Sequence, residues 1–133
     1  MELIAIGTVH SSLTERTSAP KQGDEGGPDA TLQFEAAMAD GLQGLAPGDE
    51  ILVLTWLDQA FRDVLKVRPR NDFDRPHTGV FATRSPDRPN PIGLHRVTIL
   101  AIDGAAVRVN NLEALDGTPI LDVKPLLRTV DER

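Results

Sequence analysis

The stretch LHRVTILAIDGAAVRVN (residues 94–110) indicates the fold most directly. Two runs rich in β-branched residues flank the dipeptide Asp103–Gly104, which is the strongest short-range hairpin signal in the chain. A second Asp-Gly pair, Asp116–Gly117, marks another turn before the run TPILDV (residues 118–123). The sequence therefore predicts antiparallel strands joined by short turns.

The rest of the chain adds strands and little helix. The segment around Val64–Val67 is ambiguous between a helical turn and a strand, and we favour a strand that Pro69 closes. Only EAAMADGLQGL (residues 35–45) has convincing helical composition. About seven strands and one short helix predict a mostly β fold, a small closed antiparallel or mixed β-barrel. The other strand candidates are LIAIGTV, TLQF, ILVLTWL and GVFAT (residues 3–9, 31–34, 51–57 and 79–83).

Length and composition narrow the class of protein. A chain of 133 residues fits a single domain, residues 1–133. The absence of cysteine excludes disulfides and thiolate chemistry, and the spacing of the three histidines matches no common metal motif, so we expect no metal site. No signal peptide opens the sequence and no apolar run is long enough for a membrane span. We therefore expect a soluble cytoplasmic protein.

Charge is distributed unevenly along the chain. The net charge of −6 argues against a protein that coats nucleic acid by bulk electrostatics. Between Arg62 and Arg96, however, eight basic residues stand against four acidic ones, a local charge of +4 that leaves −10 for the remainder. This basic segment is either a local site for a phosphate, a carboxylate or RNA, or a solvated loop balanced by nearby carboxylates.

The segment RSPDRPNPIG (residues 84–93) has the features of a ligand-binding loop. Its prolines fix φ at three positions, so the loop has little conformational entropy to lose on binding. We expect Arg84 and Arg88 to project from this frame together with Asn90, and Gly93 to permit close backbone approach. The alternative is that the prolines only connect two strands. The three prolines are Pro86, Pro89 and Pro91.

Two long motifs carry a resemblance to a known family. GVFATRSPDRPNPIGL (residues 79–94) and LDGTPILDVKP (residues 115–125) resemble the TsaA-like family, also called the TrmO family, of S-adenosylmethionine-dependent tRNA methyltransferases. The resemblance covers nearly the whole chain, since IGTVHSSL, PKQG, GLQGL and VRPR also look like family elements. It implies a small β-barrel domain that works as a homodimer. The implied activity is methyl transfer from S-adenosylmethionine to N6 of N6-threonylcarbamoyladenosine at position 37 of threonine tRNA.

The resemblance also implies where the cofactor binds. The main chain of an extended Ile120–Val123 would meet the adenine edge, Leu94 would cover the adenine face, and Arg84 would pair with the methionine carboxylate. Methyl transfer needs mainly in-line positioning, so a strong base is not required, and Asp122 and His95 are the catalytic candidates. The cofactor-binding positions implied are Gly23, Asp24, Glu25, Asp58, Gln59, Arg84, Leu94, Ile120, Leu121, Asp122 and Val123.

Several of these residues also have ordinary structural explanations. Asp122 beside Lys124 suits an ion pair at a strand edge. His95 suits a strand residue that faces solvent, the interpretation we favour, and the only tryptophan, Trp56, suits the core better than a base-stacking platform.

The chain departs from the family pattern at three places. Asp58 stands where many members have histidine, Leu126 follows the KP dipeptide where they have tyrosine, and the opening VHSSL lacks the usual proline. We also expect the chain to lack the C-terminal domain of longer members. These departures and the acidic charge leave alternatives to a tRNA substrate: a small-molecule acceptor, a non-enzymatic module that binds S-adenosylmethionine, or an arginine-rich loop that binds RNA without a cofactor.

Overall fold

The computed structural model describes residues 1–15, 27–68 and 77–127 of the chain. In these ranges it forms eight strands and two short 3₁₀-helices. The strands are β1 (Gly7–His10), β2 (Ala30–Phe34), β3 (Glu50–Trp56), β4 (Lys66–Val67), β5 (Thr78–Gly79), β6 (Ile92–Asp103), β7 (Ala106–Val109) and β8 (Pro119–Pro125), and the helices are η3 (Ala36–Leu42) and η5 (Val80–Ala82).

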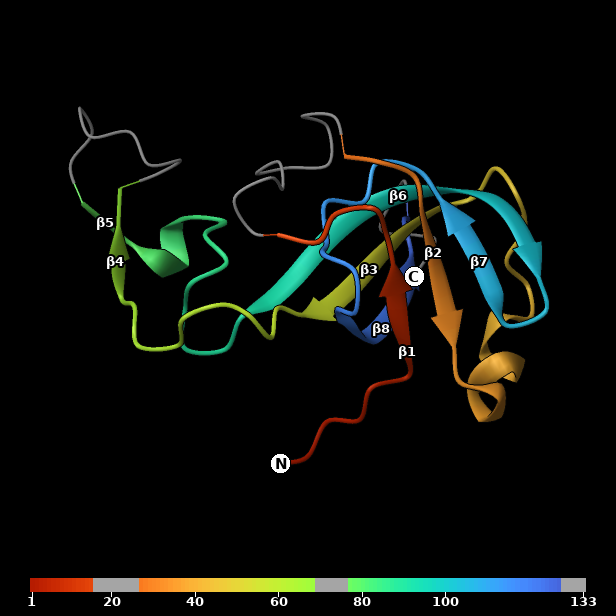
Figure 1. Ribbon diagram of the computed structural model, residues 1–133, viewed down its shortest axis with the longest axis horizontal. Coiled ribbons are helices and arrows are strands. Elements are labelled where there is room, and N and C mark those ends of the chain that lie inside the picture. The colour runs from red at the N-terminus through yellow and green to blue at the C-terminus, as the bar shows by residue number, and fades with distance from the viewer. Residues whose placement is uncertain (16–26, 69–76, 128–133) are drawn as a thin grey trace.

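Six of the strands form a closed barrel in the order β1-β2-β7-β6-β3-β8, in which every pair is antiparallel (Figure 1). The ring closes where Gly7 of β1 lies opposite Ile120 of β8. The predicted Asp103–Gly104 hairpin is present and joins β6 to β7. The predicted mostly β class is therefore confirmed, with β4 and β5 forming a separate two-stranded sheet.

The barrel interior is filled by the inward-facing side chains of alternating strand positions. In β3, for example, Ile51, Val53 and Thr55 are buried, whereas Leu52 and Leu54 on the outer face are only half-buried. The buried apolar cluster consists of Val9, Ala30, Leu32, Phe34, Leu42, Ile51, Val53, Val97, Ile99, Val107, Val109, Leu112, Ala114 and Ile120.

Two local expectations from the sequence need correction. Strand β1 begins at Gly7 rather than at residue 3, and the apolar residues that precede it are largely exposed, Leu3 by 56% and Ile4 by 64%. The predicted short helix, by contrast, is present as the 3₁₀-helix η3. The run GVFAT is not a strand beyond Gly79, because the chain turns into η5 and the Thr83 N–H donates to the Val80 carbonyl.

The chain between β3 and β6 forms an arm that projects from the barrel (Figure 1). We define the arm as residues 57–68 and 77–91; it contains β4, β5 and η5. Strand β4 confirms the preference for a strand near Val64–Val67, although it is only two residues long. Three large apolar side chains of the arm are exposed, Phe61 by 62%, Leu65 by 63% and Phe81 by 80%.

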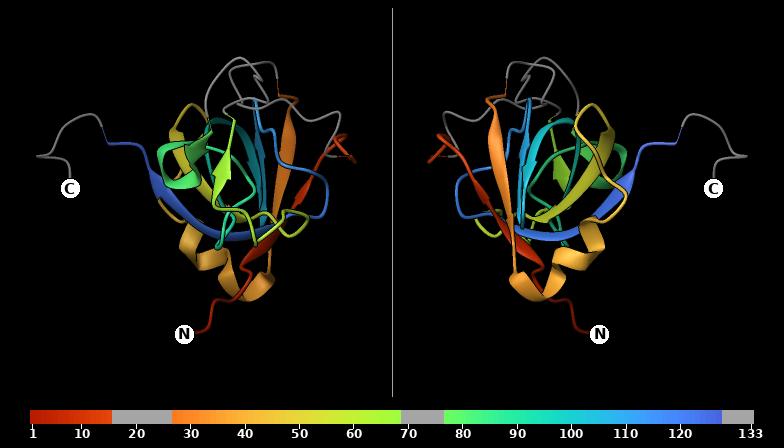
Figure 2. Two further views of the ribbon diagram at one scale, coloured as in Figure 1. Left: turned by 90° about the vertical axis from the view of Figure 1, so that its left-hand side faces the viewer. Right: turned by 90° about the vertical axis from the view of Figure 1, so that its right-hand side faces the viewer.

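The helices lie outside the barrel wall. The views in Figure 2 show η3 at the same end of the barrel as the N-terminus. No helix in the described ranges combines the length and hydropathy needed to cross a membrane.

Candidate functional site

The first half of β6 borders a pocket because β7 pairs only with the second half, residues 99–103. Just before that pairing, the Thr98 N–H donates to Oδ1 of Asn110 at 2.7 Å and the Thr98 carbonyl accepts from the Asn110 N–H at 3.1 Å. Main-chain groups of alternate residues point to the same side of a strand, so those of Leu94 and Arg96 also face this edge. The edge forms one side of the pocket.

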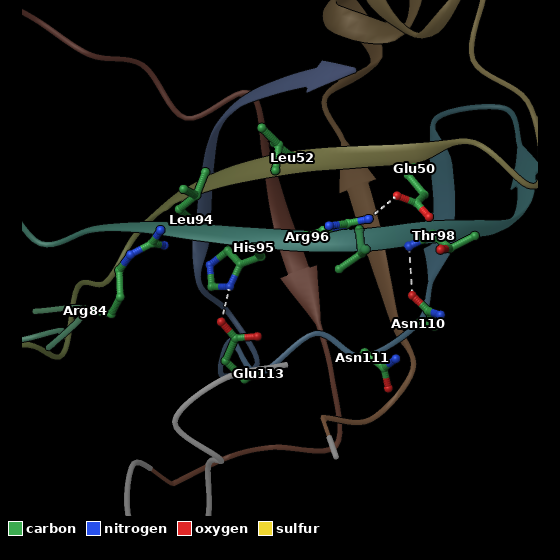
Figure 3. Close-up of a pocket in the computed structure, with 11 residues that line it drawn as sticks. Glu50, Leu52, Arg84, Leu94, His95, Arg96, Thr98, Asn110, Asn111 and Glu113 are labelled. Carbon is green, nitrogen blue, oxygen red and sulfur yellow. Dashed lines mark hydrogen bonds and ion pairs between the residues drawn. The ribbon is translucent and has the colours of Figure 1, made fainter. Parts of the chain in front are cut away.

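The pocket has a volume of about 540 Å³ and lies open to solvent on one side (Figure 3). Because it follows the edge of β6, side chains from both faces of that strand line it. Its lining residues are Glu50 and Leu52 of β3, residues 94–98 of β6, Asn110, Asn111 and Glu113 of the segment after β7, and Arg84 of the arm.

The proline-rich loop is held in place by one of its own arginines. Nη2 of Arg88 donates to the carbonyl oxygens of Val80 at 2.7 Å and Thr83 at 2.5 Å, and Nε donates to that of Ser85 at 2.8 Å. Arg88 is therefore folded into the arm and does not project as a ligand clamp, contrary to the expectation from sequence. The loop gains its shape from this arginine as well as from its prolines.

A second arginine ties the same loop to the start of the arm. Arg62 donates from Nε to the Pro89 carbonyl at 2.7 Å and from Nη2 to Oδ1 of Asn90 at 3.0 Å. Its guanidinium also lies 5.1 Å from the ring centroid of Trp56. Asn90 thus holds Arg62 through its side-chain oxygen while remaining exposed, and Trp56 is half-buried beside Arg62 instead of lying in the core.

Arg84 remains available for a ligand. It is exposed and lines the pocket together with Leu94, and within the described part of the chain it makes no hydrogen bond or ion pair (Figure 3). Leu94 itself is 45% exposed. Because Arg62 and Arg88 donate to main-chain carbonyls, Arg84 is the arginine of this loop that is available to bind an anion.

Leu94 and Asp122, two of the implied cofactor positions, lie on either side of the same residue. Leu54 of β3 pairs with Leu94 of β6 and with Asp122 of β8. A β-bulge follows at once, because Thr55 pairs with Ile120, so Leu121 has no partner in β3. The sheet register therefore brings these two positions together on three adjacent strands.

The remaining cofactor-binding positions implied by the resemblance differ in how accessible they are to a ligand. Ile120 is fully buried and its carbonyl already accepts from the Ile6 N–H at 2.8 Å, and the Val123 N–H donates to Oδ1 of Asp122, so the available main chain is chiefly that of Leu121 and Asp122. Asp58 and Gln59 lie exposed in the turn after β3. Gly23, Asp24 and Glu25 lie outside the described residues.

Asp122, one of the two catalytic candidates, makes local contacts. Its Oδ1 accepts from the Val123 N–H at 2.9 Å, and its Oδ2 lies 3.1 Å from Nζ of Lys124. Both side chains of this pair are well exposed, so the ion pair contributes under about 1 kcal/mol to stability. The ion pair considered from the sequence is present.

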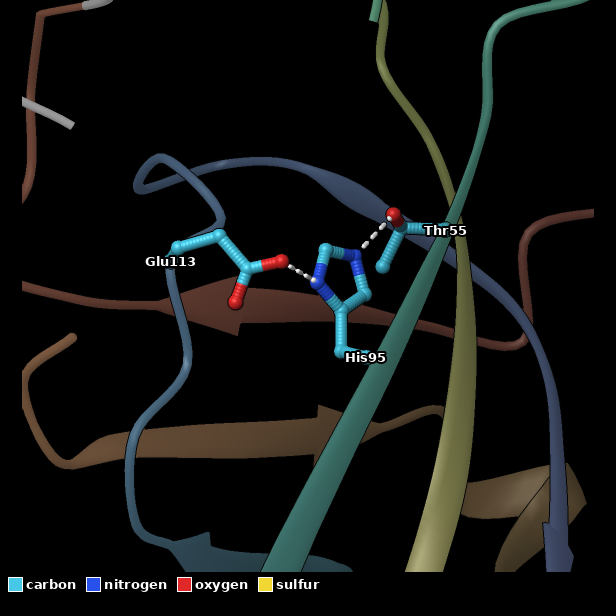
Figure 4. Close-up of polar contacts among 3 residues, drawn as sticks. All are labelled: Thr55, His95 and Glu113. Carbon is cyan, nitrogen blue, oxygen red and sulfur yellow. Dashed lines mark hydrogen bonds and ion pairs between the residues drawn. The ribbon is translucent and has the colours of Figure 1, made fainter. Parts of the chain in front are cut away.

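His95, the other candidate, is buried inside the barrel and does not face solvent as we expected. Its Nε2 lies 2.7 Å from Oγ1 of Thr55, and its Nδ1 lies 2.6 Å from Oε1 of Glu113 (Figure 4). Gly93 makes this possible, since a Cβ there would collide with Oγ1 of Thr55 and lie 2.7 Å from Nε2 of His95. This glycine makes room for two side chains of the protein rather than for a ligand.

Glu113 and Thr55 are the site residues that sequence reasoning missed. The alternation in IGLHRVTI contains the signal for His95, because Gly93, His95, Val97 and Ile99 share one face of the strand and include clear core residues. Nothing local indicates Glu113, which comes from a segment without regular structure after β7. In the described ranges, no three potential metal ligands gather in one place.

Comparison with known proteins gives consistent matches. The model of the family described as "tRNA-methyltransferase O N-terminal domain" matches residues 8–132. An S-adenosyl-L-methionine-binding protein of Archaeoglobus fulgidus is 40% identical over 131 residues, which are 98% of this chain and 93% of that protein. A probable S-adenosyl-L-methionine-binding protein of Methanothermobacter thermautotrophicus is 40% identical over 95% of this chain and 90% of its own.

Longer proteins also match. A second Archaeoglobus fulgidus protein, a probable S-adenosyl-L-methionine-binding protein, is 42% identical over 98% of this chain. This chain spans only 35% of the length of that protein. Among solved structures, a crystal structure of TrmO is 30% identical with a TM-score of 0.76, and the whole of this chain covers 62% of it. TrmO from Pseudomonas aeruginosa is 27% identical with a TM-score of 0.75, and this chain covers 60% of it.

Proposed function

The chain belongs to the tRNA-methyltransferase O N-terminal domain family, and we propose that it binds S-adenosylmethionine at this site and transfers the methyl group to a tRNA nucleoside. The observation that carries the proposal is Arg84, an exposed arginine without a described partner, which lines the pocket together with Leu94. The names of the similar archaeal proteins support the choice of cofactor.

In this proposal, each part of the site recognises one part of the cofactor. Arg84 forms a bidentate pair with the methionine carboxylate. Leu94, which lines the pocket, contacts the cofactor through its outer surface. Because β1 pairs with β8 only at Pro119 and Ile120, the main chain of Leu121 and Asp122 has an edge free of described strands, where it can hydrogen-bond to adenine.

The first requirement of the reaction is the position of its two reactants. When bound, S-adenosylmethionine supplies an electrophilic methyl group on sulfur. The arm and barrel fix where that group lies, because Arg88 and Arg62 restrain the loop that carries Arg84. Holding the two reactants in line accounts for much of the rate enhancement expected of such an enzyme.

We propose N6 of N6-threonylcarbamoyladenosine in threonine tRNA as the methyl acceptor, on the strength of the family motifs. The sequence between Arg62 and Arg96 carries a local charge of +4, which favours contact with RNA phosphates, although the chain as a whole carries −6. The cytoplasmic location and the homodimer expected from the resemblance belong to the same proposal.

Methyl transfer tests the function directly. Purified protein is incubated with S-adenosylmethionine bearing a tritiated methyl group and with tRNA from a strain that lacks the corresponding gene. We expect label in threonine tRNA, on the N6 nitrogen of threonylcarbamoyladenosine. Label in a small molecule instead would support another acceptor. Binding of S-adenosylmethionine without any transfer would support a second candidate, a non-enzymatic binding module, which the names of the archaeal relatives favour.

A further inference from the structure

Glu113 presents one carboxylate oxygen to the pocket while the other is held. Its Oε1 lies 2.6 Å from Nδ1 of His95, and Figure 3 shows the second oxygen directed away from the imidazole ring. The Glu113 side chain is 16% exposed and that of His95 is 3% exposed. Because the buried His95 holds one oxygen of Glu113, the orientation of this carboxylate at the pocket is fixed.

Two carboxylates line this pocket, and their surroundings differ. Oε2 of Glu50 forms an ion pair of 2.8 Å with Arg96, and both side chains of that pair are well exposed. Glu113 has no lysine or arginine partner among the described residues; its partner is the imidazole of His95. Of the two, Glu113 is therefore the carboxylate that is not paired with a guanidinium among the described residues, and its second oxygen is the one we consider as a proton acceptor.

The hydrogen bonds around His95 suit an ionised Glu113. A carboxylate can only accept, so Nδ1 of His95 carries a proton and donates it. In the neutral imidazole Nε2 then accepts from the Thr55 hydroxyl, and all three groups are satisfied. Gly93 leaves the space that this chain of bonds needs.

The acceptor proposed above needs a base. The N6 nitrogen of a threonylcarbamoyl group carries a proton, and its lone pair is delocalised into the neighbouring carbonyl and the purine ring, so it is a poor nucleophile until that proton leaves. Glu113 lines the same pocket as Arg84 and Leu94, the residues assigned to the cofactor.

We propose that Glu113 is the proton acceptor of the methyl transfer, with His95 and Thr55 as its positioning residues. The N6–H proton passes to the free oxygen of Glu113 as N6 forms a bond to the methyl carbon. The bond between that carbon and sulfur breaks, and its electron pair stays on sulfur, which gives S-adenosylhomocysteine. This inference rests on the proposed function and extends it to an acceptor with an acidic N–H group.

The test compares Glu113→Gln with the wild-type protein. Glutamine keeps the size and can still accept from His95, but it cannot take a proton. We expect the affinity for S-adenosylmethionine to stay within about twofold, and the single-turnover rate of tRNA methylation to fall by about 100-fold or more. In the wild type the rate should rise from acid pH to a plateau, and in Glu113→Gln this rise should disappear. Glu35→Gln, an exposed carboxylate outside the pocket, is the matched control.

The outcomes separate the inference from the function on which it rests. A wild-type protein that methylates tRNA, with a Glu113→Gln rate within threefold and an unchanged pH profile, overturns the role of Glu113 and leaves the methyltransferase standing. A wild-type protein that transfers no methyl group overturns both. Equal thermal unfolding of Glu113→Gln and wild type shows that a lost rate is not lost fold.

Discussion

Nη2 of Arg88 lies 2.7 Å from the carbonyl oxygen of Val80, eight residues earlier in the chain. This contact makes Arg88 a brace of the proline-rich loop and leaves Arg84 as its exposed cation. Two arginines four residues apart in one motif therefore have different roles, one in shaping the loop and one in meeting the ligand.

Replacing Arg88 tests the brace. Arg88→Ala removes three donations to main-chain carbonyls, so we expect a loss of about 1–3 kcal/mol in the free energy of unfolding, measured by urea denaturation. Arg88→Lys should recover little of this loss, since an ammonium group lacks the planar fork. Arg84→Ala serves as the control and should unfold like the wild type. Equal stability of Arg88→Ala and wild type would show that the three bonds contribute nothing.

Gly93 tests the packing around His95. In Gly93→Ala the new methyl group collides with Oγ1 of Thr55, so we expect a destabilisation of about 1–3 kcal/mol by denaturant unfolding. Adding Thr55→Ala to the same chain should recover part of that loss, a non-additive effect that a double-mutant cycle measures. Gly41→Ala is the matched control, because no atom lies within 4 Å of a Cβ there. A Gly93→Ala protein of wild-type stability would contradict the described packing.

Replacing Asn111 tests whether the left-handed backbone conformation at this pocket-lining residue affects stability. It has φ of 47°, a left-handed conformation that glycine adopts at little cost and alanine does not. We expect Asn111→Ala to lose about 1 kcal/mol of stability, and Asn111→Gly to remain close to the wild type. The stabilities of the two variants are compared with that of the wild type by thermal unfolding. The reverse order of stability would mean that the Asn111 side chain, rather than its backbone conformation, maintains this turn.

Much of the fold could be predicted because local signals and tertiary packing agree. The local sequence alone indicates the turn at Asp103–Gly104 and the apolar strand β3, and the structure confirms both. The run GVFAT has the composition of a strand, but its residues after Gly79 form η5 because Arg88 and Thr83 both hydrogen-bond to the Val80 carbonyl. That arrangement depends on contacts that local composition does not reveal.

The candidate site likewise contains some residues that the sequence could predict and others that it could not. Arg84 and Leu94 could be found from the motif, and the structure places both at one pocket. The inward direction of His95 follows from the period of two along β6, but its partner Glu113 is 18 residues away in an irregular segment. Only the closed barrel brings that segment against the start of β6, so sequence patterns alone could not pair the two residues.

Titration calorimetry with S-adenosylmethionine tests the central claim most directly, on the wild type, on Arg84→Ala and on Arg108→Ala as control. Arg108 is an exposed arginine whose partner is Asp29, at 3.4 Å, and it does not line the pocket. We predict micromolar binding by the wild type and Arg108→Ala, and affinity at least about tenfold weaker for Arg84→Ala, the loss expected when a charge-assisted pair is removed. Wild-type affinity in Arg84→Ala, or no binding by any of the three, would contradict the assignment of this pocket to the cofactor.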